Sequence, residues 1–227
     1  MEHPTSPNRA RSELAAVARE AATCTACALS ATRTQVVPGE GAAPAPLVLV
    51  GEAPGAREDQ TGRPFAGASG RLLDELLASI NLARGDLFIL NTVKCRPPNN
   101  RSPRSAEIVA CAPFLNRQLR AIQPRVIATL GRSALSVFAP SATIAEVHGR
   151  PYAQTEGRVP PGAVLFPLYH PAAALHNGSL RPTLKQDIAA LGALLAEHIR
   201  EDAMAATLRE EDSVPVRLRS TRVGEAE

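Results

Sequence analysis

Four short runs of aliphatic residues constrain the fold of this chain more than any other feature of its sequence. They occupy residues 46–51, 87–91, 125–131 and 164–170. Continuous aliphatic runs of this length are typical of strands in a parallel sheet that is covered on both faces. Helical spacing of apolar residues is found between and around them, at residues 9–22, 70–82, 102–123, 133–139 and 183–199. The alternation predicts an α/β fold with a central, mostly parallel, four-stranded sheet flanked by helices.

The length and composition agree with one compact domain. The chain has 227 residues, of which 44% are hydrophobic but only 3% aromatic: five Phe, two Tyr and no Trp. The core must therefore be filled by aliphatic side chains, and any ring outside it is a candidate for function. We expect a domain over residues 1–199 and a charged tail over residues 200–227. The tail has no clear periodicity, which leaves disorder open.

No apolar run reaches the roughly 18 residues that span a bilayer. The N-terminus lacks the basic-then-apolar pattern of a signal peptide. We therefore expect a cytoplasmic protein without a membrane partner. The formal net charge of +3 is compatible with a nucleic-acid partner but does not establish one.

Four cysteines are spaced like metal ligands. Cys24 and Cys27 form a C-x2-C pair, and Cys95 and Cys111 follow later in the chain. In a reducing compartment such thiols are more often ligands than disulfides. Zinc and an iron–sulfur cluster both accept four thiolates. The spacing predicts a four-thiolate metal site and does not choose between the two.

Three polar segments directly follow predicted strands. Residues 51–55 follow the first strand, residues 91–98 the second, and His170 ends the fourth. In parallel α/β sheets, ligands bind outside the carboxyl ends of the strands. We therefore expect the three segments to meet on one rim and to form the functional site.

The same segments carry motifs that together resemble family 4 uracil-DNA glycosylases, the iron–sulfur type. The motifs are GEAPG and GRPFAG within residues 51–67, NTVKCRPPNNR at residues 91–101, and HPAAAL at residues 170–175. The resemblance covers roughly residues 10–198 and includes the cysteines. It implies one α/β domain with a [4Fe–4S] cluster held by Cys24, Cys27, Cys95 and Cys111. It also implies a DNA-repair enzyme that releases uracil from single- or double-stranded DNA and leaves an abasic site.

The resemblance assigns two catalytic residues. Glu52 would position or activate the attacking water and stabilise the cationic sugar. His170 would hydrogen-bond uracil O2 and stabilise the departing anion, a role that preorganised donors commonly fill. Whether His170 acts as a neutral donor or as an imidazolium is left open by the sequence.

Further residues would bind the base: Ala53, Glu58, Phe65 and Asn91, together with His170. Phe65 would stack on the flipped uracil. The Asn91 carboxamide has both a donor and an acceptor and would pair with uracil O4 and N3–H. Glu58 would wall the C5 edge against the methyl group of thymine; the alternative is a salt bridge within its loop.

Contacts to DNA are expected from Lys94, Arg96 and Arg101, as phosphate ligands, and from Leu175, as an apolar wedge in the vacated base stack. After His-Pro the family commonly has Ser or a similar small residue and then two bulky residues, where this chain has Ala172, Ala173 and Ala174. The resemblance therefore implies less efficient flipping from duplex DNA and favours single strands. We expect a monomer.

Two other functions compete with this hypothesis. One is a metal-stabilised DNA-binding protein with weak or no catalysis, which the presence of Glu52, Phe65, Asn91 and His170 together disfavours. The other is a relative that cross-links to uracil-DNA, which carries an inserted, His-containing loop; residues 96–104 are short and contain no His.

Overall fold

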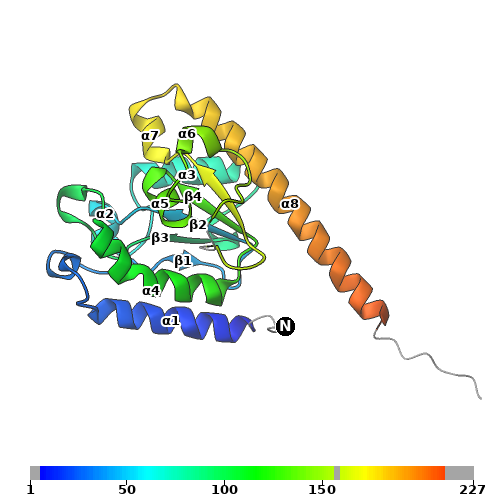
Figure 1. Ribbon diagram of the computed structural model, residues 1–227, viewed down its shortest axis with the longest axis horizontal. Helices are drawn as coiled ribbons and strands as arrows, with labels where there is room; N and C mark the ends of the chain where they lie inside the picture. Colours follow the sequence, from blue (N-terminus) through cyan, green and yellow to red (C-terminus); the bar gives the residue numbers. More distant parts are fainter. Residues whose placement is uncertain (1–5, 156–158, 213–227) are drawn as a thin grey trace, which may run out of the picture.

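The computed structural model describes residues 6–155 and 159–212 of the chain, with side chains up to residue 204 (Figure 1). Its centre is a five-stranded sheet in the order β1-β3-β2-β4-β5. The strands are β1 (Glu40–Gly41), β2 (Leu47–Gly51), β3 (Phe88–Asn91), β4 (Val126–Leu130) and β5 (Val164–Leu168). Strands β2 to β5 are mutually parallel, whereas β1 pairs antiparallel to β3. The mostly parallel α/β sheet is confirmed, with five strands rather than the four predicted. The added edge strand has two residues and no apolar run to signal it.

Eight α-helices are present in the described ranges. They are α1 (Pro7–Thr23), α2 (Ala56–Thr61), α3 (Ala68–Ala78), α4 (Ser105–Ile122), α5 (Arg132–Phe138), α6 (Ile144–Val147), α7 (Pro171–His176) and α8 (Leu180–Asp212). All five predicted helices are found, with shifted ends. Helices α2, α6 and α7 have six residues or fewer, too few for apolar periodicity to develop.

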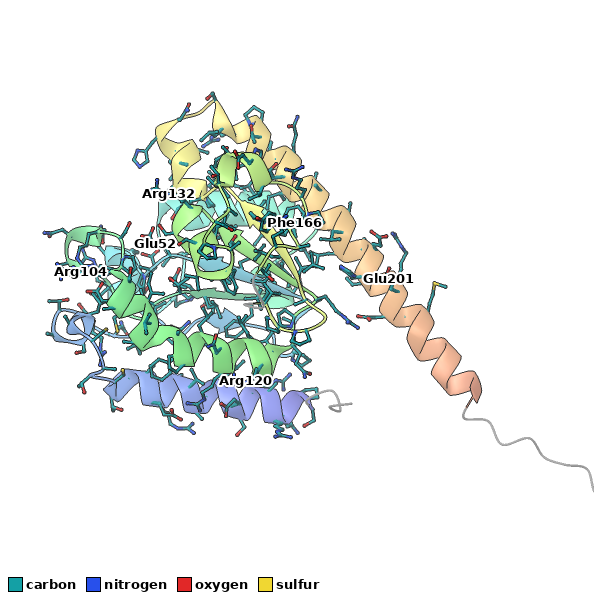
Figure 2. The ribbon with its side chains drawn as sticks, in the orientation of Figure 1. Glu52, Arg104, Arg120, Arg132, Phe166 and Glu201 are labelled. Carbon is teal, nitrogen blue, oxygen red and sulfur yellow. The ribbon has the colours of Figure 1, made fainter. Side chains whose placement is uncertain are left out.

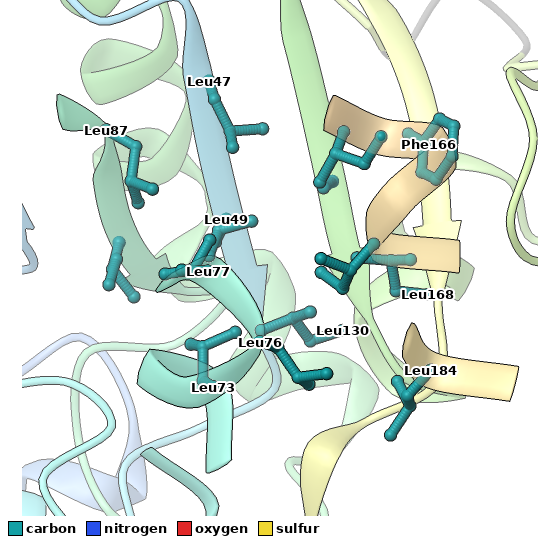
Figure 3. Close-up of a cluster of buried hydrophobic side chains, with 14 of the residues drawn as sticks. Leu47, Leu49, Leu73, Leu76, Leu77, Leu87, Leu130, Phe166, Leu168 and Leu184 are labelled. Atoms are coloured by element: carbon teal, nitrogen blue, oxygen red, sulfur yellow. The ribbon is translucent and has the colours of Figure 1, made fainter. Parts of the chain in front are cut away.

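The sheet separates two apolar cores, which explains why its strands are aliphatic throughout. Along β2, Leu47 and Leu49 face one core and Val48 and Val50 the other, as alternation of side chains requires. Figure 3 shows part of the first core, which leucines of α3 share with side chains of β2, β4 and β5, among them Phe166. The second core contains apolar side chains of α4 and α5.

Helix α1 lies along α4 on the outside of the second core (Figure 1). Arg117 of α4 joins the two helices: its Nε is 2.7 Å from Glu13 Oε1, and its Nη2 is 3.0 Å from Glu20 Oε1. This packing matters for the cysteines, because Cys24 directly follows α1 and Cys111 lies on α4.

The C-terminal helix α8 continues beyond its predicted end at residue 199 and extends away from the body of the molecule (Figure 1). Arg125, just before β4, holds the extension through its Nε, 2.9 Å from Asp202 Oδ2. The domain boundary predicted at residues 199–200 thus falls inside a helix, and residues 213–227 of the predicted tail lie outside the described residues. Within the described ranges, no helix combines the length and the apolar character that crossing a membrane requires.

Candidate active site

The carboxyl ends of β2, β3 and β5 bring polar and aromatic side chains together. Gly51 at the end of β2 is the register partner of Asn91 at the end of β3. A Cβ at Gly51 would lie 2.3 Å from Asn91 Oδ1 and 2.8 Å from Phe65 Cζ. Gly51 therefore leaves room for the Asn91 amide and the Phe65 ring at one point. The predicted meeting of the three segments is found here.

Phe65 lies over His170 in a strained backbone conformation. Their ring centroids are 5.7 Å apart, with 24° between the ring planes. Phe65 is buried, and its φ of 52° is in the left-handed region. That conformation costs about 1–3 kcal/mol for a residue with a side chain, so neighbouring contacts must hold it. One ring of this aromatic-poor chain is thus fixed at the rim.

His170 caps helix α7 with its ring. Its Nδ1 accepts a hydrogen bond of 3.0 Å from the backbone N–H of Ala172. Because Nδ1 is the acceptor, the proton of the neutral ring is on Nε2. Burial lowers the pKa of His170, although the carboxylates of Glu52 and Glu58 oppose this. Burial therefore favours the neutral imidazole, with its proton on Nε2.

Glu52 follows β2, and one of its carboxylate oxygens is not paired within the described ranges. Its Oε1 is buried and has no hydrogen-bond partner among the residues that the structure describes. A buried carboxylate oxygen without a donor is costly, so a water molecule or a developing positive charge would be favoured beside it. Figure 2 shows Glu52 on the same side of the molecule as Arg132, the first residue of α5.

Asn91 presents a carboxamide that is free to bind a ligand. The residue is buried, and within the described ranges no side chain or backbone group hydrogen-bonds to its amide. Its backbone carbonyl, in contrast, accepts a bond of 2.7 Å from Lys94 Nζ. The donor and the acceptor of the amide are thus both unpaired within the described residues.

Glu58 orders the loop between β2 and α3. Its two carboxylate oxygens accept three backbone N–H groups at 2.8–3.1 Å, those of Gly55, Ala66 and Gly67. The contacts observed for Glu58 are therefore with its own loop, and Arg63 pairs with Glu40 instead. Ala53 is half-buried in the same loop and packs against the apolar cluster that contains Cys95 and Cys111.

Lys94 does not have the position that a phosphate ligand needs. It is 1% exposed, and its Nζ donates inward to the Asn91 carbonyl. Burial lowers the pKa of Lys94 to about 8, with the Cys111 sulfur opposing the shift. We therefore correct the expectation for this residue: its ammonium is an internal charge between the rim and the cysteines.

The other predicted DNA contacts lie at the surface. Arg101 forms a two-bond pair with Glu107, at 2.7 and 2.8 Å, and Arg96 Nε is 2.8 Å from Asn100 Oδ1. Both guanidinium groups thus shape the loop before α4 while remaining partly accessible. Leu175 on α7 is 42% exposed, as a wedge requires.

The four cysteines line one small cavity, together with Arg33 and Lys94. Three N–H groups are directed at sulfur: Arg33 Nη1 is 3.3 Å from Cys95 Sγ, Lys94 N is 3.3 Å from Cys111 Sγ, and Ala26 N is 3.5 Å from Cys24 Sγ. In the described part of the chain, no group of three His, Cys, Asp or Glu side chains is placed to hold a metal ion.

The charges around this cavity fit an anionic metal–thiolate group. Burial raises the pKa of the Cys95 and Cys111 thiols. The Arg33 guanidinium opposes this shift at Cys95, and the Lys94 ammonium opposes it at Cys111. A thiol must lose its proton to bind metal, so these two cations favour the ligating form.

Three residues of the site were not found from the sequence. Gly131 has φ +88°, and a Cβ there would lie 3.0 Å from His170 Cβ. Its position directly after a strand was an available signal. The other two are Arg33, which is directed at Cys95 Sγ, and Arg84, which donates to the Phe65 carbonyl. Both lie outside every motif, and their partners are far away in the sequence, so no local pattern reveals these contacts.

Comparison with known proteins identifies the family of this chain. A sequence model of the uracil DNA glycosylase superfamily matches residues 38–191. A type-4 uracil-DNA glycosylase of Sulfurisphaera tokodaii is 45% identical over 179 residues, 75% of this chain and 80% of that protein. One of Saccharolobus solfataricus is 44% identical over 75% of this chain and 81% of its own length. One of Thermotoga maritima is 46% identical over 73% of this chain and 85% of its own length.

The pair formed by Arg101 and Glu107 predicts a loss of stability in acid. The hydrogen bonds from Arg101 and then from the Arg104 N–H hold the pKa of Glu107 at about 2, below its ordinary 4.5. Since the pKa is depressed on folding, the stabilisation is complete above about pH 4.5 and is lost as the pH falls towards 2. We expect the free energy of unfolding of Glu107→Gln to differ most from that of the wild type at neutral pH. The difference should shrink across that acid window in urea titrations.

Glu75→Gln is the matched control, because Glu75 is exposed on α3 and its side chain contacts no charged partner among the described residues. Its stability should follow that of the wild type at every pH. A Glu107→Gln deficit that did not change with pH would contradict the assignment.

Proposed function

Because the chain belongs to the uracil-DNA glycosylase superfamily, we propose that it is a monofunctional DNA-repair glycosylase, which hydrolyses the N-glycosidic bond of deoxyuridine and leaves an abasic site. One observation carries the proposal: the rim holds an unpartnered Glu52 oxygen, an Asn91 amide without partners and a neutral His170 donor. Its partner is uracil-containing DNA. A single chain supplies all of these residues, so a monomer is sufficient.

Recognition begins with a flipped base, since the bond to be broken cannot be reached inside a duplex. The Phe65 ring stacks on uracil, and the Asn91 carboxamide bonds its O4 and N3–H. Cytosine presents the reverse order of donor and acceptor at these positions. The loop that Glu58 orders, with Ala53 at its start, borders the pocket.

The chemistry separates charge between the sugar and the base. As the bond between C1′ and N1 breaks, its electron pair leaves with uracil and positive charge develops on the sugar. His170 Nε2–H donates to O2 and stabilises the anion. The Glu52 carboxylate stabilises the cationic sugar and holds the water whose oxygen bonds to C1′. It accepts the proton that this water releases.

The surface residues position DNA. The accessible edges of Arg96 and Arg101 contact phosphates, and Leu175 fills the space that the flipped base vacates. With only alanines at residues 172–174, the wedge is small, so single-stranded DNA is the preferred substrate.

The four cysteines would hold a [4Fe–4S] cluster, with zinc as the alternative. Bound metal would join the end of α1, the segment after β3 and helix α4. Hydrolysis transfers no electron, so the group has a structural role. Free thiols persist in a reducing compartment, so a metal site built from cysteines is consistent with a protein of the cytoplasm.

Alkali treatment after incubation with an oligonucleotide that contains one uracil tests the function. We expect a strand break at the uracil and none in the same sequence with thymine. Glu52→Gln should lower the single-turnover rate constant about 10²–10⁴-fold, the range of a lost general base. Glu75→Gln is the control and should match the wild type.

Two outcomes would overturn this function. A heat-stable band of lower mobility would identify a cross-linking protein. Binding of uracil-DNA without any strand break after alkali would identify a binding protein without catalysis.

The protonation state of His170 predicts a pH profile for the same reaction. Because burial lowers its pKa below the ordinary 6.5, the ring is neutral at and above neutral pH. We expect kcat/KM to stay level around pH 7, below the pKa of about 8 of Lys94, whose ammonium holds the Asn91 carbonyl. It should fall in acid, where the ring gains a proton.

The acid limb should disappear in His170→Gln, whose kcat/KM should be low and flat across the same range. A wild-type activity that rises in acid would show that the imidazolium is the donor. That outcome would contradict the neutral assignment.

The metal proposal is tested by elemental analysis and visible absorbance of the purified holoprotein. We expect iron and the broad absorbance of iron–thiolate bonds, and we expect both to be lost in Cys95→Ser along with thermal stability. Val109→Ala changes an exposed side chain two residues from Cys111 and should keep its metal. Stoichiometric zinc without iron would select the alternative, and a fully stable, active protein without metal would refute both.

A further inference from the structure

A charged network contacts the backbone carbonyls of Pro64 and Phe65. It consists of Arg84, in the turn before β3, with Glu40 of β1 and Asp74 of α3. Arg84 Nε is 2.7 Å from Asp74 Oδ1, and Arg84 Nη1 is 3.1 Å from Glu40 Oε1. The Arg84 side chain is 22% exposed. The two carboxylates thus fix the guanidinium plane from two sides.

The remaining donors of Arg84 bind the loop that carries Phe65. Its Nη1 donates to the Pro64 carbonyl at 2.9 Å, and its Nη2 donates to the Phe65 carbonyl at 2.6 Å. Two consecutive carbonyl groups are therefore held by one planar fork. A lysine, with a single nitrogen, could not hold both carbonyls and both carboxylates in this way.

This peptide segment needs such a restraint. Phe65 has a positive φ, which residues with side chains rarely adopt. Its carbonyl also lies against the start of α3, where a Cβ at Gly70 would be only 1.7 Å from the Phe65 oxygen. The same backbone conformation directs the ring towards Gly51 and His170. Relaxation of the backbone would therefore move the ring.

We infer that Arg84 is a positioning residue for base recognition: it holds the Pro64 and Phe65 carbonyls so that the Phe65 ring lies where a flipped uracil would stack. Arg84 does not touch the base itself. The inference rests on the proposed glycosylase function. Arg84, with Glu40 of β1 and Asp74 of α3, thus supports base recognition from outside all three motifs of the rim.

A double-mutant cycle separates this role from a general contribution to stability. We would measure kcat/KM on a uracil-containing oligonucleotide for Arg84→Gln, Phe65→Ala and the double variant. Each single variant should lose about tenfold or more, within the range that base–aromatic stacking supplies. If Arg84 acts through Phe65, the double variant should lose no more than about twofold beyond Phe65→Ala. Affinity for the same oligonucleotide without uracil should be unchanged.

Arg63→Gln is the matched control. Arg63 pairs with the same carboxylate, Glu40, but its side chain is 66% exposed, and within the described residues it forms no hydrogen bond to the carbonyl of Phe65 or Pro64. Its kcat/KM should be within twofold of the wild type. Thermal unfolding of every variant establishes that the proteins compared are folded, and Arg84→Lys, which retains the charge, serves if Arg84→Gln does not fold.

The outcomes distinguish a failure of the proposed glycosylase function from a failure of the role inferred for Arg84. A wild type that excises no uracil would refute the glycosylase function itself. An active wild type with losses that multiply in the double variant, or with an unaffected Arg84→Gln, would refute the inference and leave the function standing. Weaker binding of DNA without uracil by Arg84→Gln would also count against it.

Discussion

The parallel pairing of β2 with β3 is the contact on which the site depends. It places Gly51 beside Asn91 and leaves no room for a side chain between them. The loop with Glu52 and Phe65 leaves from one strand of this pair, and the segment with Lys94 and Cys95 leaves from the other. Two aliphatic cores hold the pair in the middle of the sheet. The geometry of the rim is therefore set by the best-buried part of the molecule, as preorganised polar groups require.

Much of this arrangement could be predicted from local pattern. The aliphatic runs predicted the parallel strands because both faces of the sheet are covered, and position after a strand predicted the rim. Contacts between residues far apart in the sequence could not be predicted. In the sequence, Lys94 lies close to Arg96 and is expected at the surface, yet it is buried. Arg84 and Arg33 act on segments about 20 and 60 residues away, which no spacing reveals. The two-residue strand β1 gave no periodic signal at all.

The segment from Asn91 to Cys95 connects the two functional regions of the chain. Its first residue presents the amide to the rim, and its last presents a thiol to the cysteine cavity. Between them, the Lys94 ammonium bonds the Asn91 carbonyl, while the Lys94 N–H is directed at Cys111. The loss of Lys94 from the set of phosphate contacts thus has a physical explanation: its charge balances buried sulfur and holds the turn that carries the amide.

The bond between the Ala172 N–H and His170 Nδ1 has an evolutionary consequence. A main-chain donor belongs to every amino acid except proline. Changes of side chain at residue 172 would therefore leave the tautomer of His170 intact. Helix α7 could therefore vary its composition without altering which ring nitrogen of His170 carries the proton.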